Sequence, residues 1–211
     1  GSLHPTPVPT TTTTTTTLGE EIQCMVWGDP HIVTFDLMRT VRRSFWDEKH
    51  RNWDHRGHWR LGRHIVPDVF KSGDFWVVKS ARVLIQGRYG RSGGYALHGL
   101  AFGGAFLGNH RLAIDRLWEG KVAVTWDGRA VSSNFRNGLA RVSLSRRNSR
   151  GRLLEGAVDL PEGVRVTLKR TEWNRGRGAA VTAHITMRKQ PGFMDGHCGP
   201  ADGNFADDTK E

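Results

Sequence analysis

Two stretches near the C-terminal end decide the fold class: residues 163–170, GVRVTLKR, and residues 180–188, AVTAHITMR. In both stretches every second residue is apolar, and most of the residues between them are polar or charged. A period of two residues is typical of antiparallel strands that bury one face and expose the other. The positions expected to face inward are Val164, Val166, Leu168, Val181, Ala183, Ile185 and Met187.

The rest of the chain favours the same class. Residues 174–178, NRGRG, lie between the two stretches and are rich in turn formers, so we expect a hairpin. A second hairpin is expected in residues 121–131, where Asp127-Gly128 suits a type I′ turn. Further strands are expected in residues 74–80, 81–90 and 97–114. No segment has the pattern of a long amphipathic helix. The sequence therefore predicts an all-β fold, either an antiparallel β-sandwich or a curled sheet with long loops.

The 211 residues are enough for one domain and an appendage. Residues 1–20 form the appendage: Gly1-Ser2 resembles a tag scar, and residues 5–17, PTPVPTTTTTTTT, are low in complexity. Such a Thr/Pro-rich segment cannot bury a core and is typical of an extended, mucin-like linker with O-glycosylation sites, or of a plain disordered spacer. The domain is therefore expected to span residues 21–211.

The formal net charge of +10 favours an acidic partner. Arginine supplies most of it, and the planar guanidinium suits carboxylate, sulfate and phosphate groups. The basic residues are scattered, however, and often alternate with apolar ones, which is also the pattern of solvated strand faces. No nucleic-acid-binding motif and no apolar run of about 18 residues occurs, so we expect neither nucleic acid nor membrane insertion.

Two motifs stand at the ends of the predicted domain. Residues 24–36 read CMVWGDPHIVTFD, and residues 196–208 read GHCGPADGNFADD. Together they resemble the opening and closing motifs of von Willebrand factor type D domains, and the resemblance covers about residues 22–208. Three departures make this a divergent, minimal version. Leu37 follows Thr-Phe-Asp where the family has Gly, Pro200-Ala201 stand where Asn and an aromatic are common, and only two cysteines are present.

The resemblance implies a disulfide between Cys24 and Cys198. By chain entropy, closing so long a loop stabilises a fold by about 4–5 kcal/mol. A disulfide in turn implies a secreted or extracellular protein, or the luminal part of a membrane-anchored one. The residues alone leave open two free, buried thiols.

The resemblance also implies Ca²⁺ at the closing motif. Calcium binds about six to eight oxygen atoms supplied by a flexible loop. Gly199 and Gly203 allow the backbone to curl, while Pro200 replaces a common Asn ligand. The alternative is a polar turn whose aspartates accept hydrogen bonds from nearby amides. The candidate ligands are Asp202, Asn204, Asp207 and Asp208.

The Asp29-Pro30 bond in the opening motif is a candidate site of autoproteolysis. The Asp29 carboxyl can attack its own main-chain carbonyl and form a cyclic anhydride, if the Pro30 nitrogen is protonated as it leaves. His31 is the adjacent acid, and Gly28 allows a close backbone approach. Some mucins and the repulsive guidance molecules share this Gly-Asp-Pro-His motif and cleave themselves there, whereas other type D domains stay intact. The alternative is a turn capped by Asp29 and His31.

Residues 46–64, WDEKHRNWDHRGHWRLGRH, form an expected long loop. Its histidines match no zinc spacing that we can identify. Exposed tryptophan beside arginine also suits sugar stacking. The residues concerned are His50, His55, His58, His64, Trp46, Trp53 and Trp59.

The sequence therefore predicts an extracellular structural or adhesive module that cleaves itself once. The alternative is an uncleaved module that binds matrix or polyanionic glycans. We see no nucleotide loop, catalytic triad or pair of carboxylates in a cleft, so no turnover enzyme is expected.

Overall fold

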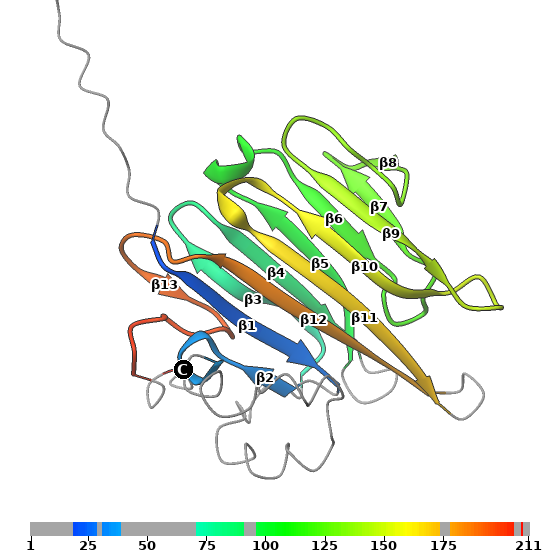
Figure 1. The fold of residues 1–211 in the computed structure, drawn as a ribbon, viewed down its shortest axis with the longest axis horizontal. Helices are drawn as coiled ribbons and strands as arrows, with labels where there is room; N and C mark the ends of the chain where they lie inside the picture. Colours follow the sequence, from blue (N-terminus) through cyan, green and yellow to red (C-terminus); the bar gives the residue numbers. More distant parts are fainter. Residues whose placement is uncertain are drawn as a thin grey trace, which may run out of the picture.

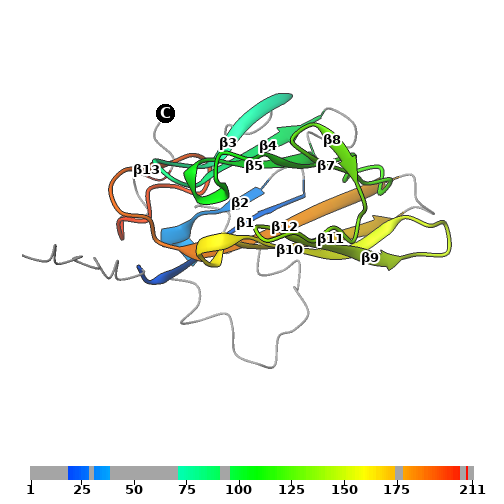
Figure 2. The same cartoon turned by 90° about the horizontal axis from the view of Figure 1, so that it is seen from above.

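A computed structural model describes residues 19–28, 31–38, 71–90, 96–173, 178–204 and 208. Two antiparallel sheets, of six and seven strands, lie face to face. Figure 2 shows them edge-on as two layers. The prediction of an all-β fold is confirmed, and the sandwich is the correct one of the two architectures left open.

The six-stranded sheet has the order β2-β1-β12-β11-β10-β9. Consecutive strands β9 to β12 pair as a meander, and the N-terminal strand β1 then pairs with β12, the last strand of that meander. The strands are β1 (Glu21–Trp27), β2 (His31–Val33), β9 (Arg141–Arg147), β10 (Leu153–Asp159), β11 (Arg165–Trp173) and β12 (Gly178–Arg188).

The seven-stranded sheet has the order β13-β3-β4-β5-β6-β7-β8. It is a meander from β3 to β8, with the short β13 added at the β3 edge. The strands are β3 (Gly73–Ser80), β4 (Leu84–Tyr89), β5 (Leu97–Gly103), β6 (Leu112–Asp115), β7 (Ala123–Trp126), β8 (Arg129–Val131) and β13 (Met194–Asp195).

Helical structure in the described residues is short. Residues 35–38 form one helical turn, and η2 (Ala105–Leu107) and η3 (Pro161–Gly163) are 3-10 turns. No helix of the described residues is long and apolar enough to cross a membrane.

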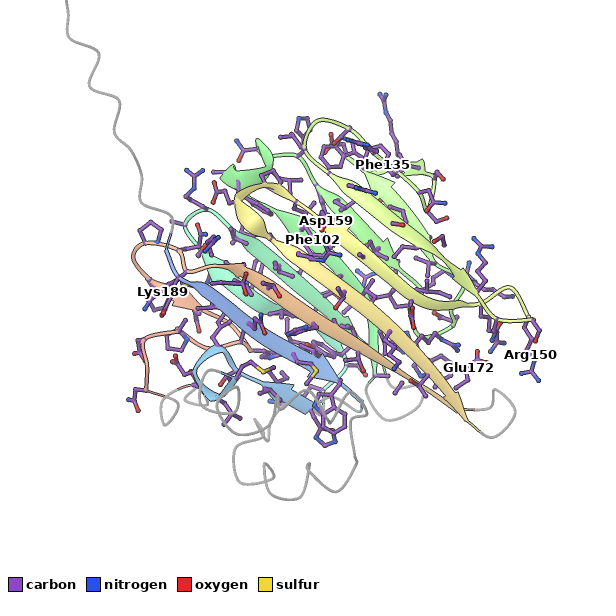
Figure 3. All side chains as sticks on the ribbon, viewed as in Figure 1. Phe102, Phe135, Arg150, Asp159, Glu172 and Lys189 are labelled. Carbon is purple, nitrogen blue, oxygen red and sulfur yellow. A yellow bond between two sulfur atoms is a disulfide. The ribbon has the colours of Figure 1, made fainter. Side chains whose placement is uncertain are left out.

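The core lies between the two sheets. All seven positions predicted to face inward on β11, β12 and the residue before β11 are buried there. Phe102 of β5, labelled in Figure 3, contributes a large side chain from the opposite sheet. Because successive residues of a strand point to opposite faces, the alternation in the sequence translates directly into this two-layer core.

Both predicted hairpins form. β11 and β12 pair from Arg165 to Trp173, and β7 and β8 pair across Asp127-Gly128. Asp127 and Gly128 both have positive φ, 49° and 77°, which a type I′ turn requires. Residues 174–177 and the predicted loop 46–64 lie outside the described residues.

Strands β9, β10 and β13 were not anticipated from the sequence. β9 includes the run SRR and is followed by NSRGR, so its alternation of Val142 and Leu144 with polar residues is short. Its pairing with β10 also carries two register shifts. A bulged pair of this kind interrupts the period of two that a sequence pattern depends on.

The core position Ile185 tests the importance of this packing. It is fully buried in β12, opposite Cys24 of β1 and Val166 of β11. We expect Ile185→Ala to lower the free energy of unfolding by about 2–5 kcal/mol, because it leaves a cavity between two sheets. The exposed Lys169→Ala on β11 is the control, with an expected change of about 0.5 kcal/mol. Urea denaturation measures both, and equal losses would contradict the described packing.

Candidate functional site

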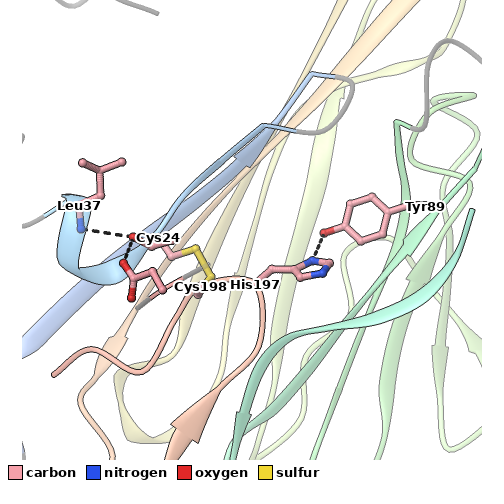
Figure 4. The surroundings of a disulfide bond; sticks show 7 residues. Cys24, Leu37, Tyr89, His197 and Cys198 are labelled. Atoms are coloured by element: carbon pink, nitrogen blue, oxygen red, sulfur yellow. Dashed lines mark hydrogen bonds between the residues drawn. A yellow bond between two sulfur atoms is a disulfide. The ribbon is translucent and has the colours of Figure 1, made fainter. Parts of the chain in front are cut away.

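The two motifs at the ends of the domain meet at one place. Cys24 of β1 and Cys198, which follows β13, form a disulfide across 174 residues of sequence, with their Cα atoms 5.7 Å apart. Figure 4 shows this bond, with the helical turn that carries Leu37 on one side and His197 on the other. The predicted pairing is therefore present, and it fits an extracellular or luminal location.

The main chain at Cys198 connects the two sheets. Its amide donates to the carbonyl of Val77 in β3, at 2.9 Å, and its carbonyl accepts from the amide of Phe35, at 2.8 Å. Its sulfur is bonded to β1. Since β1 and β3 belong to different sheets, Cys198 directly joins the two layers of the sandwich.

Asp208 closes the contact from the C-terminal side. Its carboxylate accepts a hydrogen bond from the hydroxyl of Thr34, which in turn accepts from the amide of Leu37 at 3.3 Å. Gly199 lies against the same carboxylate, and a Cβ at that position would collide with it. Asp208 is only 8% exposed, so its carboxylate lies within the fold.

Asp36 brings a second buried carboxylate to the closing motif. It is 5% exposed, and it accepts hydrogen bonds from the main-chain amides of Gly203 and Asp202. Burial raises the pKa of Asp36 above its usual value and the charge of Asp202 raises it further, whereas the two amide hydrogen bonds and Lys189 oppose the rise. Both motifs thus place an aspartate beside residues 199–204.

The structure describes three of the four predicted calcium ligands, Asp202, Asn204 and Asp208. Asp202 and Asn204 are exposed, and Oδ1 of Asp202 accepts from the amide of Asn204 at 2.8 Å, as in the alternative prediction of a polar turn. Asp208 is buried against Thr34, and Asp207 lies outside the described residues. Within the described part of the chain, no group of three or more His, Cys, Asp or Glu is arranged to hold a metal ion.

Sequence reasoning missed Asp36 as a site residue. It belongs to the quoted motif Thr-Phe-Asp, but its contact with Asp202 and Gly203 depends on how the chain ends meet. The signal in the sequence was an aspartate two residues after Thr34, within a motif already identified.

The predicted cleavage site lies between two paired strand ends. Asp29 and Pro30 themselves are outside the described residues. On either side, Trp27 of β1 pairs with His31 of β2, so the chain passes from one strand to the other in three residues. The rings of Trp27 and His31 are 4.3 Å apart between centroids.

Gly28 occupies the first position of that connection. It has a φ of +69°, a conformation that side chains other than glycine rarely adopt, and a Cβ there would lie 3.2 Å from Cδ2 of His31. The imidazole of His31 is therefore held between the Trp27 ring and the Gly28 backbone, one residue after Pro30.

A second histidine packs beside the disulfide. The Tyr89 hydroxyl lies 3.4 Å from Nδ1 of His197, and Phe75 stacks on the imidazole with centroids 5.6 Å apart. Burial lowers the pKa of His197, against the attraction of Asp195, and burial raises the pKa of Tyr89. Both side chains are therefore neutral near pH 7, which suits groups that pack beside the buried Cys198. The only sign of this contact in the sequence is the histidine that directly precedes Cys198.

Residues 46–64, which carry the four clustered histidines, lie outside the described part of the chain. The prediction of a long loop there, with sugar stacking as an alternative role for its tryptophans, stays a prediction.

Comparison with known proteins adds no relative. Neither the scan against protein-family models nor the search of curated proteins returns a match.

The buried Asp36 predicts a specific pH dependence of stability. Its pKa is higher in the folded than in the unfolded chain, so its contribution to stability is fully present at low pH. That contribution is lost as the pH rises through the pKa of Asp36 in the folded protein, which lies above the ordinary carboxyl pKa of about 4. We therefore expect Asp36→Asn, in EDTA, to gain stability relative to wild type between about pH 4 and pH 7.

Urea titrations across that pH range measure the difference between the two proteins. Asp202→Asn is the companion variant. It should shift the loss of stability with rising pH to lower pH, because the charge of Asp202 contributes to the raised pKa of Asp36. A difference between wild type and Asp36→Asn that stays constant or falls with pH would contradict the assignment.

Proposed function

We propose that the chain is an extracellular structural module of the von Willebrand factor type D kind, which cuts itself once between Asp29 and Pro30 and stays joined through Cys24–Cys198. The observation that carries the proposal is the meeting of the two motifs on which the resemblance rests. The disulfide, the Phe35–Cys198 hydrogen bond and the Thr34–Asp208 hydrogen bond all connect one motif to the other.

The proposed reaction needs no second substrate until its last step. A carboxylate oxygen of Asp29 attacks the carbonyl carbon of the same residue, and the bond from that carbon to the Pro30 nitrogen breaks. The nitrogen takes a proton, for which His31 is the proposed donor, and a cyclic anhydride remains on Asp29. Water then adds to the anhydride and leaves two carboxyl groups.

The strand pairing on both sides supports this reaction. Trp27 and His31 pair with each other in the β1–β2 ladder, so both ends of the connection that contains the proposed bond are fixed. Reactions within one chain gain most from such restriction, because the reacting groups are already close together. Gly28, with its positive φ and its contact with His31, is the residue that sets the direction of the connection.

A cleaved chain would stay assembled. Glu21 to Val26, upstream of the break, pair with β12 at six successive positions. Cys24 lies within that segment and is bonded to Cys198, far downstream of the break. The upstream fragment is therefore retained by a covalent bond as well as by strand pairing.

Gel electrophoresis with and without reductant tests the cleavage. We expect one band without reductant and two with it, a short piece ending at Asp29 and the remainder beginning at Pro30. Asp29→Asn should give one band in both lanes, because an amide does not form the anhydride. His31→Gln should slow the appearance of the second band.

The reduced wild-type sample decides the matter. A single species at the full mass of 23.6 kDa, even after incubation in mild acid, would refute self-cleavage. Lys169→Ala serves as a matched variant that should cleave like wild type, since this exposed side chain lies on β11, which β12 separates from β1.

We further propose that Ca²⁺ binds beside residues 199–204. Carboxylate oxygens are the ligands that calcium prefers, and the fold places two buried ones, from Asp36 and Asp208, against this segment. Asp202 and Asn204 supply further oxygen atoms nearby. A bound cation would favour the charged form of Asp36, whose carboxylate is otherwise destabilised by burial.

Thermal unfolding in calcium and in EDTA tests this site. A ligand that binds only the folded state stabilises it by about 2.7 kcal/mol at a hundred times its dissociation constant. We expect wild type to unfold at a higher temperature in calcium, and Asp36→Asn to lose most of that increase. Asp159→Asn, on the exposed side of β10 and ion-paired to Arg165, is the control. Identical unfolding of wild type in calcium and EDTA would contradict the proposal.

The alternative, a polyanion-binding module, has less support. On the outer face of the six-stranded sheet, Arg165 forms an ion pair with Asp159 at 2.9 Å, and Lys169 lies opposite Glu155. These acidic partners partly neutralise the basic face on which that prediction depended.

A further inference from the structure

The outer face of the seven-stranded sheet carries a shallow groove over β4, β5 and β6. Its lining includes three small residues, Gly99, Ala101 and Ala113. Ala101 and Ala113 are directly opposite each other across β5 and β6, and Gly99 comes two residues earlier on the same face. The Asp115 carboxylate lies against Gly99, whereas Ala101 and Ala113 carry only methyl groups and leave a shallow hollow beside it, in a surface that side chains normally cover.

One side of the groove is lined by a fixed cluster of charges. Arg88 donates to both carboxylate oxygens of Asp74, at 2.8 and 3.0 Å, and to Asp115 at 3.0 Å. Arg111 also lines the groove, and its charge adds to that of Arg88 in lowering the pKa of Asp74. Two arginines and two aspartates balance in charge, and bidentate pairing holds the Arg88 guanidinium in one orientation.

An exposed tryptophan stands beside the groove, two residues after Asp74 on β3. Trp76 of β3 is 38% exposed, and it is paired directly with Gln86, which lines the groove. Directly paired residues project from the same face of a sheet, with their Cβ atoms about 5 Å apart. The indole and the groove therefore share one face. That face is the outer one, because the next residues along the two strands, Val77 and Ile85, are fully buried in the core between the sheets.

These features suit one class of ligand. A pyranose ring has an apolar C–H face that can pack on an indole, and hydroxyl groups that both donate and accept hydrogen bonds. Arg88 supplies donors, Asp74 and Asp115 supply acceptors, and Gln86 supplies both. The balanced charge disfavours a sulfate or phosphate, which would meet two carboxylates, and the open shape disfavours a buried apolar ligand. We propose that this groove binds a neutral saccharide.

The proposal is independent of self-cleavage and of calcium, because the groove contains no residue of either motif. The probes are the methyl glycosides of glucose, galactose, mannose and N-acetylglucosamine and short neutral oligosaccharides built from them. Saturation-transfer NMR detects weak binding of each to the full chain. Heparin fragments serve as the polyanionic comparison.

Two variants and a matched control locate the binding. Ala113→Leu fills the hollow from the outer face, and Trp76→Ala removes the indole. Ala157→Leu makes the same substitution on the outer face of the other sheet, beside the fully buried Val158. Thermal unfolding checks that all three variants remain folded.

We expect at least one neutral saccharide to bind wild type and Ala157→Leu equally, at low salt and at about 0.5 M salt, where exposed charge interactions are screened. Trp76→Ala should weaken that binding about ten-fold or more, and Ala113→Leu should abolish it. Absence of binding by every neutral probe, or equal binding by Ala113→Leu and wild type, would overturn the proposal. Binding of heparin alone, lost at high salt, would overturn it in favour of a polyanion.

Discussion

The covalent bond between Cys24 and Cys198 determines how the two ends of this domain are arranged. It joins β1, in one sheet, to a segment whose amide hydrogen bonds hold it to β3, in the other. The interior behind it is apolar, so the sheets would associate without the bond, but hydrophobic contact has no direction. The disulfide and the directional hydrogen bonds of Cys198 specify which edges coincide, and the positions of Thr34, Asp36 and Asp208 follow from that alignment.

Local pattern was sufficient for the strands that alternate cleanly. β11 and β12 owe their assignment to a period of two over eight or more residues, and the turn at Asp127-Gly128 follows from backbone chemistry alone. β9 and β10 were missed because bulges break their pairing. The choice between a sandwich and a curled sheet depends on how faces pack over long distances, and no short window of sequence records that.

The same contrast between local pattern and long-range contact applies to the candidate site. The cysteine pair and the aspartates of the closing segment were implied by the resemblance of the two motifs to a known family. Asp36 gained its role from amides at Asp202 and Gly203 that only the folded chain brings near. The outer groove was also hidden, since Ala101 and Ala113 are unremarkable in sequence and come together only through the register of β5 against β6.

The strand β1 also has a mechanical consequence. It runs antiparallel to β12 from Glu21 onward, and Cys24 follows only three residues after its first residue. Tension applied to the chain before Gly19 would load the β1–β12 ladder along its length, so that several hydrogen bonds resist together. Beyond Glu21, Ile22 and Gln23, the load passes through the sulfur atoms to Cys198. The disulfide can thus transmit a pulling force whether or not the peptide bond after Asp29 is intact, and reduction would let an uncut chain extend but would leave a cut chain held by strand pairing alone.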